Sequence, residues 1–178
     1  MLKYMLLALM SLTMIHSIGA YEEFYADLDG TPAYSGDANL NDNSAGLVKP
    51  CNGIIVQGYS DSVSYGVEPH RGVDIAGLKN TPLVSMGDGV IVNLFRSHRY
   101  GIAVEIKLDS GLELLYAHLE NYEGESGRIR EGQRIKAGER VGTMGTTGMS
   151  LGVHLHLEIR QNGKHIDPEP ILMAIGNE

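Results

Sequence analysis

The chain has 178 residues, enough for one domain of ordinary size with short additions, and its 43% hydrophobic content supports a folded core. Aromatic residues make up only 6%, there is no Trp, and 23 residues are Gly, which favours strands and turns over a helical bundle. The formal net charge of −8 argues against binding to a phosphate backbone, so no nucleic-acid partner is expected.

The first twenty residues have the layout of a secretory signal peptide. The segment MLKYMLLALMSLTMIHSIGA places Lys3 before an apolar run and ends in small residues at Ala20. This run is shorter than the ~20 residues that a spanning helix needs, so no stable membrane span is expected after cleavage. An uncleaved anchor is the alternative. Residues 1–20 are predicted to direct the protein to the periplasm, the cell wall or the extracellular space.

Residues 21–50 are acidic and contain scattered Gly, Asn, Ser and Pro, without a sustained period of two or 3.6 residues. This composition is typical of a linker or a loosely docked arm.

Cys51 is the only cysteine, so an intramolecular disulfide is excluded. Its side chain is predicted to be buried as a small apolar group.

From Cys51 onward the sequence is typical of β-structure. Glycines recur every few residues over 130–148, as in short strands joined by tight turns. The DSG segment at 109–111 predicts a hairpin turn. Segments rich in Val, Ile and Leu are predicted to be strands at 88–97, 100–109 and 112–120.

The C-terminal part combines a strand and a helix. Residues 153–166 predict a long strand followed by an NG turn, and 167–176 predict a short helix with Asp167 as its N-cap and Pro168 at its first position. There is no strong internal repeat and no βαβ alternation. We therefore predict an all-β, antiparallel domain over residues 51–176 with a short C-terminal helix.

Two histidines stand one residue apart in the apolar run GVHLHLEIR. Side chains alternate faces along a strand, which places His154, His156 and Glu158 together, opposite a face formed only by Leu and Ile. The apolar face is the predicted core face, so both histidines point away from it. Alternation alone leaves open whether both bind a metal, one binds while the other does chemistry, or neither does.

A third histidine lies in the segment LLYAHLE. Strict alternation places His118 on the same face as Leu114 and Tyr116, opposite a purely apolar face. A lone histidine of this kind is more often structural than catalytic, and it gains significance only from other polar residues nearby. Tyr116 is predicted either to help hold a site or to pack.

The segment HRGVDIAG, residues 70–77, supplies such residues. Gly72 indicates a turn, after which Asp74 alternates against Val73 and Ile75, so His70 and Asp74 can converge on one point. An Asp between two β-branched residues of a strand is unfavourable without a purpose. The alternative is an Asp that hydrogen-bonds a turn.

Together these motifs supply four histidines and one aspartate. Such ligands suit Zn²⁺, which takes three protein ligands and keeps an open position in catalytic sites. Five candidates exceed three ligands, so the surplus would serve as acid and base groups, and spacing does not assign the roles. No role is predicted for the remaining histidines, His16, His98 and His165.

The ordered motifs H-x-G-x-D, Y-A-H-L and G-x-H-L-H resemble those of the LytM/lysostaphin-type zinc metallopeptidases, which cut peptide bonds in bacterial peptidoglycan. The resemblance runs from about Gly58 to Pro168. It departs from the family pattern at Val153, usually Pro, and at Leu157, usually an aromatic residue. It implies an antiparallel β-sheet or sandwich of the LytM (duplicated hybrid motif) type, with the site in a groove.

Carried over by position, the resemblance implies that His70, Asp74 and His156 bind one Zn²⁺ per domain and that His118 and His154 are the catalytic histidines. It implies a zinc-dependent endopeptidase acting on cross-links or stem peptides of peptidoglycan. The alternatives are a non-catalytic wall-binding regulator or amidase activator, and a zinc carboxypeptidase that trims stems. The bond cut, the division of labour between the two histidines and any recruiting protein partner are left open.

Overall fold

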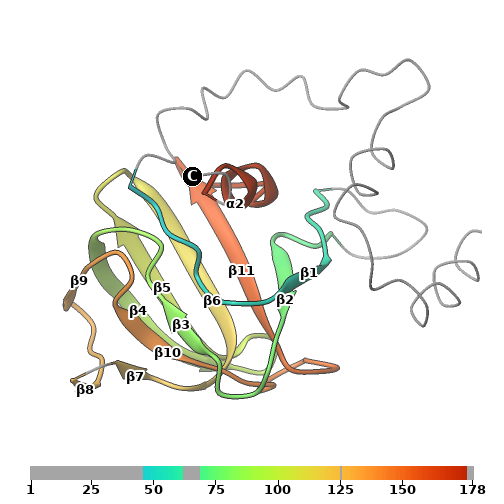
Figure 1. Ribbon diagram of the computed structural model, residues 1–178, viewed down its shortest axis with the longest axis horizontal. Helices are drawn as coiled ribbons and strands as arrows, with labels where there is room; N and C mark the ends of the chain where they lie inside the picture. The colour runs from blue at the N-terminus through green and yellow to red at the C-terminus, as the bar shows by residue number, and fades with distance from the viewer. Residues whose placement is uncertain (1–45, 62–68, 125, 176–178) are drawn as a thin grey trace, which may run out of the picture. The chain divides into compact units, whose positions relative to one another are not determined.

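Antiparallel strands make up about half of the chain that the computed structural model describes, residues 46–61, 69–124 and 126–175 (Figure 1). One helix, α2 (Glu169–Ile175), lies within these residues. The antiparallel all-β fold with a short C-terminal helix is therefore confirmed. The strands are β1 (Ile54–Gln57), β2 (Val73–Ala76), β3 (Pro82–Val84), β4 (Gly89–Ser97), β5 (Gly101–Leu108), β6 (Leu112–Asn121), β7 (Glu123–Gly124), β8 (Gly127–Arg128), β9 (Arg134–Ile135), β10 (Arg140–Met144), β11 (His154–Gln161) and β12 (Lys164–Ile166).

The main sheet has the strand order β1-β2-β11-β6-β5-β4-β9, and every pairing in it is antiparallel. In addition, β10 pairs with β3 and β6, β12 pairs with β11, and β7 and β8 form a separate small sheet. Consequently β11, which carries the H-x-H motif, lies between β2 and β6, the strands of the other two motifs (Figure 1). Three motifs far apart in sequence become neighbours across three strands.

The main core lies on one face of the sheet, where the apolar residues of β11 point. Leu155, Leu157 and Ile159 are fully buried there, as alternation predicts. The opposite face carries a much smaller apolar cluster built on Ala103, Leu115 and Ala117. The polar residues of β11 therefore lie on the face with the smaller cluster, where a site can open to solvent.

The C-terminal helix begins as the sequence predicts. The backbone N–H of Glu169 donates to a side-chain oxygen of Asp167 at 2.9 Å, which is an N-cap with Pro168 at the first helical position. Ile171 and Leu172 are buried in the main core, so the helix is held against the sheet.

The segment directly before Cys51 contacts the domain. Leu47 packs against the main core, the N–H of Val48 donates to the carbonyl of Met86 at 2.8 Å, and the N–H of Val84 donates to the carbonyl of Pro50 at 2.9 Å. The predicted signal segment, 1–20, and residues 21–45 of the predicted arm lie outside the described residues. Within the described part of the chain, no helix is long and apolar enough to cross a membrane.

Cys51 is expected to react slowly with thiol reagents in the folded protein. It is a free cysteine packed against the main core, and burial raises the pKa of its thiol to about 12. Almost no reactive thiolate then exists at pH 8. Titration with a chromogenic disulfide reagent at that pH should give slow labelling in buffer and fast labelling in denaturant. Equally fast labelling in both would contradict this placement.

Candidate metal centre and active site

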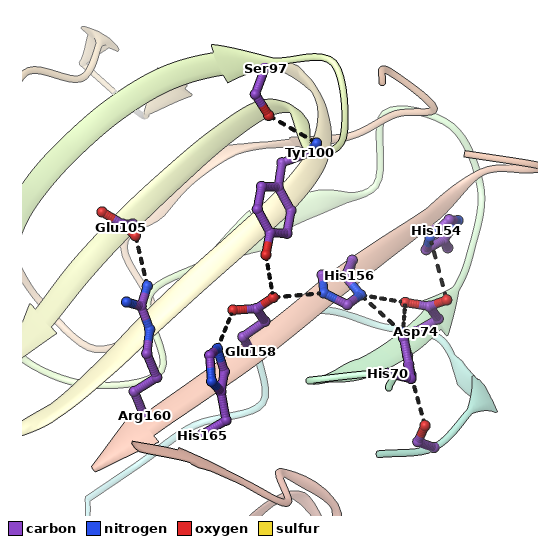
Figure 2. Close-up of polar contacts among 11 residues, drawn as sticks. His70, Asp74, Ser97, Tyr100, Glu105, His154, His156, Glu158, Arg160 and His165 are labelled. Carbon is purple, nitrogen blue, oxygen red and sulfur yellow. Dashed lines mark hydrogen bonds and ion pairs between the residues drawn. The ribbon is translucent and has the colours of Figure 1, made fainter. Parts of the chain in front are cut away.

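Three of the residues predicted from the sequence form a tight cluster of possible ligands. His156 Nδ1 lies 2.8 Å from Asp74 Oδ1, His70 Nε2 lies 3.1 Å from the same oxygen, and the two ring nitrogens are 3.2 Å apart. Figure 2 shows the three side chains pointing toward one another from β11, β2 and the segment before β2. The pairing of β11 with β2 sets this geometry because it places His156 directly opposite Asp74.

The donor set of this cluster fits a metal ion. Ligand atoms at ~2.0–2.2 Å from a tetrahedral zinc lie roughly 3.3 Å from one another, close to the three separations observed. The other ring nitrogen of each histidine is already engaged. His70 Nδ1 lies 2.7 Å from the carbonyl oxygen of Gly58, and His156 Nε2 lies 3.3 Å from Glu158 Oε1. Because these oxygens accept, the engaged nitrogens carry the protons, and the lone pairs of the other two face Asp74.

Three acceptor atoms this close to one another need a cation or a proton between them. Burial lowers the pKa of His156, but its hydrogen bonds with Asp74 and Glu158 raise it more, so the net pKa is raised. Burial raises the pKa of Asp74, but its bonds with His156 and His70 lower it more, and the net pKa is well below the ordinary range. The cluster therefore favours positive charge at its centre.

His118 lies on the face of β6 opposite to the one that strict alternation predicts. The prediction that it shares a face with Leu114 and Tyr116 is wrong. Tyr116 is fully buried in the main core and donates its hydroxyl to the carbonyl of Val84 at 2.9 Å, so of its two predicted roles it has the packing role. His118 instead lies 5.9 Å, between ring centroids, from His156 on the other face.

A β-bulge in β6 causes this change of face. Ile102 of β5 pairs with Leu119 and Val104 pairs with Tyr116, so one residue of β5 faces two of β6. His118 has a φ of 62°, in the left-handed region that a non-glycine residue seldom adopts. A bulge of this kind re-aims a side chain, and here it turns His118 toward β11.

His118 and His154 lie side by side next to the ligand cluster, with ring centroids 4.7 Å apart. The carbonyl of Thr147 lies 2.7 Å from His118 Nδ1, and the carbonyl of Gly152 lies 3.0 Å from His154 Nδ1, so both Nδ1 atoms donate. Each neutral ring therefore keeps Nε2 as a proton acceptor. Burial lowers the pKa of His118 below its ordinary value, which keeps that ring neutral near pH 7.

All five predicted residues line one groove of about 590 Å³. His154 Nε2 is 3.6 Å from Asp74 Oδ2, outside the tight cluster that His156 joins. Apolar side chains on β1 and on the loop before β11, namely those of Val56, Met149 and Leu151, are exposed along the groove. The groove therefore offers an apolar wall beside a polar centre, an arrangement that suits an extended peptide.

Two residues behind the ligand cluster are not predicted from the sequence. Alternation places Glu158 on the correct face of β11 without indicating a role for it, and no role is predicted for His165. Glu158 Oε2 lies 2.8 Å from His165 Nε2, and Glu158 Oε1 accepts from the hydroxyl of Tyr100 at 2.8 Å. Burial raises the pKa of Glu158, but its bonds with His156, Tyr100 and His165 lower it more, to about 2. The period-two pattern of β11 and the NG hairpin carry the signal that could have found both residues.

Replacing Gly148 with alanine is expected to destabilise the loop that carries the Thr147 carbonyl. Gly148 has a φ of 78°, and a Cβ there would lie 2.2 Å from the backbone nitrogen of Gly101. Gly138 has a φ of 80° with nothing within 4 Å, so Gly138→Ala is a matched control for backbone strain alone. We expect the control to lose about 1–2 kcal/mol of unfolding free energy and Gly148→Ala to lose at least as much again. Urea denaturation measures both, and equal losses would contradict the close approach.

The sequence model of peptidase family M23 matches residues 68–168, more than half of the chain, and the chain belongs to this family. The match spans the whole set of clustered residues. Solved structures agree with this. The catalytic domain of the antimicrobial peptidase lysostaphin from Staphylococcus simulans superimposes with a TM-score of 0.59 at 28% identity, covering 68% of this chain and 93% of that one. The resemblance to LytM/lysostaphin-type peptidases is therefore confirmed.

A structure described as a zinc-containing peptidase from Vibrio cholerae matches with a TM-score of 0.59 at 26% identity, over 71% of this chain and 38% of that one. Among curated relatives, a DD-carboxypeptidase/endopeptidase, Mpg, from Neisseria meningitidis is 39% identical over 104 residues, 58% of this chain. The murein hydrolase activator NlpD of Salmonella dublin is 34% identical over 120 residues, 67% of this chain. The matched regions cover only 23% and 29% of these two relatives.

Proposed function

We propose that the chain is a zinc-dependent endopeptidase that hydrolyses peptide bonds of bacterial peptidoglycan. One observation carries the proposal. Three ligand atoms, from His70, Asp74 and His156, converge on one point, and two further histidines, His118 and His154, lie beside them in the same groove. Three protein ligands with room for substrate are the arrangement of a catalytic rather than a structural zinc site.

When bound, zinc supplies Lewis acidity, lowering the pKa of a water from ~15.7 toward ~7 and polarising the scissile carbonyl. The chain's own residues supply the proton transfers. Nε2 of a neutral His118 or His154 accepts the proton of the attacking water, and the resulting imidazolium returns it to the leaving amine. The Thr147 and Gly152 carbonyls hold the two rings by their Nδ1 protons.

The relatives support a peptidoglycan substrate and also define the two alternatives. Mpg is named as both a carboxypeptidase and an endopeptidase, so trimming of peptidoglycan stem peptides is one alternative activity. NlpD is named as an activator of murein hydrolases, which keeps a regulatory role as the other. The complete set of five clustered residues favours an enzyme, because a protein that only activates another has no need of a metal centre with two flanking bases.

A wall substrate also agrees with the proposed export signal at residues 1–20 and with a location in the periplasm or at the cell wall. Under this proposal residues 21–50 link the signal to the catalytic domain, 51–176. A recruiting protein partner is one way to bring a chain of this size to the wall.

The proposal is tested by mass spectrometry of peptidoglycan digested with the purified chain and zinc, followed by a muramidase. We expect cross-linked dimers to be converted into monomers with intact stems. Stems shortened by one residue, with dimers unchanged, would identify a carboxypeptidase. No product from the chain alone, together with faster release of stems by an added amidase, would identify an activator and contradict the proposal.

A further inference from the structure

A buried carboxylate lies directly behind the metal centre. Glu158 is only 2% exposed, and its three hydrogen-bond partners come from three different parts of the sheet: Tyr100 beside β5, His156 on β11 and His165 on β12 (Figure 2). Within the described residues it makes no ion pair with Lys or Arg. Its charge is therefore stabilised by two imidazoles and one phenol.

A buried carboxylate without a permanent cation is costly to maintain, which points to a specific task. Glu158 Oε1 is shared between His156 and Tyr100, while Oε2 faces His165. Both oxygens are thus engaged, so the carboxylate is held at a fixed orientation. The ring of His156 is consequently tied at Nε2 to a fixed acceptor, and its Nδ1 faces Asp74 at 2.8 Å.

We propose that Glu158 is a positioning residue for the metal centre, which keeps the proton of His156 on Nε2 and fixes the ring so that Nδ1 points at the site shared with His70 and Asp74. The nearby negative charge also makes the ring a stronger ligand, as carboxylates behind ligating histidines do. Tyr100 and His165 act through Glu158, because they hold its two oxygens in place. The inference rests on the proposed function of this cluster as a zinc site.

The matched control is Glu105, a partly buried carboxylate on β5 of the same sheet. It accepts from Arg160 at 2.7 Å and contacts none of the proposed ligands (Figure 2). Glu105→Gln should lower stability without changing zinc affinity. Any general effect of removing a carboxylate from this sheet is thereby separated from an effect on His156.

The experiment measures the zinc dissociation constant of the full chain by competition with a chromophoric chelator, without substrate. We expect Glu158→Ala to weaken zinc binding by about 10–100-fold. Glu158→Gln keeps one oxygen acceptor for His156 but loses the charge, so it should give a smaller loss. The isosteric Gln variant keeps the test available if the Ala variant does not fold.

A second readout needs no metal. The Nε2 proton of His156, bonded to a buried carboxylate, should give a downfield imidazole N–H resonance that exchanges slowly with solvent. This resonance should disappear in Glu158→Ala and persist in Glu105→Gln. Loss of this resonance in Glu158→Ala alone would show that it depends on the hydrogen bond to Glu158. A Glu158 that only packed against its neighbours would not produce such a resonance.

His165 is tested by a double-mutant cycle. His165→Phe should weaken zinc binding less than Glu158→Ala does, and it should add nothing in the Glu158→Ala background. Wild-type zinc affinity in both Glu158 variants, or additive effects of the two substitutions, would overturn the inference. Failure of the wild-type chain itself to bind zinc would instead overturn the proposed function, and with it the need for a positioning residue.

Discussion

Substitution of Asp74 by alanine is expected to abolish both zinc retention and peptidoglycan hydrolysis. Asp74 Oδ1 lies 2.8 Å from His156 Nδ1 and 3.1 Å from His70 Nε2, and its removal leaves two imidazoles without the carboxylate that completes the donor set. Loss of a direct ligand should weaken zinc binding by more than the ~100-fold upper limit for outer-shell partners. Elemental analysis after gel filtration measures the bound zinc, and digestion of peptidoglycan measures the activity.

Asp109 provides the control for this substitution. It is an exposed carboxylate at the β5–β6 turn that pairs with Arg134 at 2.7 Å. Neither residue of this pair lines the groove. Asp109→Ala should keep full zinc content and activity. One zinc per chain and undiminished hydrolysis in Asp74→Ala would show that the proposed ligand set is wrong.

Substitution of His118 by asparagine is expected to lower kcat/KM by about 10²–10⁴-fold while the zinc content stays near one per chain. In the proposed mechanism the ring accepts a proton through Nε2, and it takes no part in the ligand cluster, so its loss should affect proton transfer and leave metal binding intact. Asparagine is the suitable replacement, because the φ of 62° at this position is tolerated by Asn far better than by Ala.

The measurement is the initial rate of dimer cleavage, with zinc content determined on the same preparation. His98→Asn is the matched control, since His98 is an exposed histidine in the β4–β5 turn and does not line the groove. An unchanged rate in His118→Asn would remove this residue from the catalytic pair. Loss of zinc together with activity would show that His118 is a ligand instead.

The sequence predicts the fold well where alternation is uninterrupted. On β11 the apolar residues are fully buried and the polar ones line the site, because a regular strand with one buried face fixes its register strongly. The short strands β1 and β3 were not predicted. All four residues of β1 are exposed, so it carries no alternating burial pattern, and β3 has only three residues.

The sequence names the five residues that gather in the groove, but it does not predict their detailed geometry. Nothing in the segment LLYAHLE predicts a bulge, because the residue that adopts a positive φ there, His118, is not a glycine. Alternation therefore gives the wrong face for His118. His165 is missed for a different reason: the NG turn indicates that the chain folds back after β11, but it does not indicate that His165 then meets Glu158.

The division of labour among the histidines is tested most directly by anomalous scattering at the zinc edge from crystals of the zinc-loaded protein. We expect one peak within ~2.0–2.2 Å of His70 Nε2, Asp74 Oδ1 and His156 Nδ1, with His118 and His154 beside it but uncoordinated. A metal coordinated by both His154 and His156, or a peak outside this groove, would contradict the proposed centre.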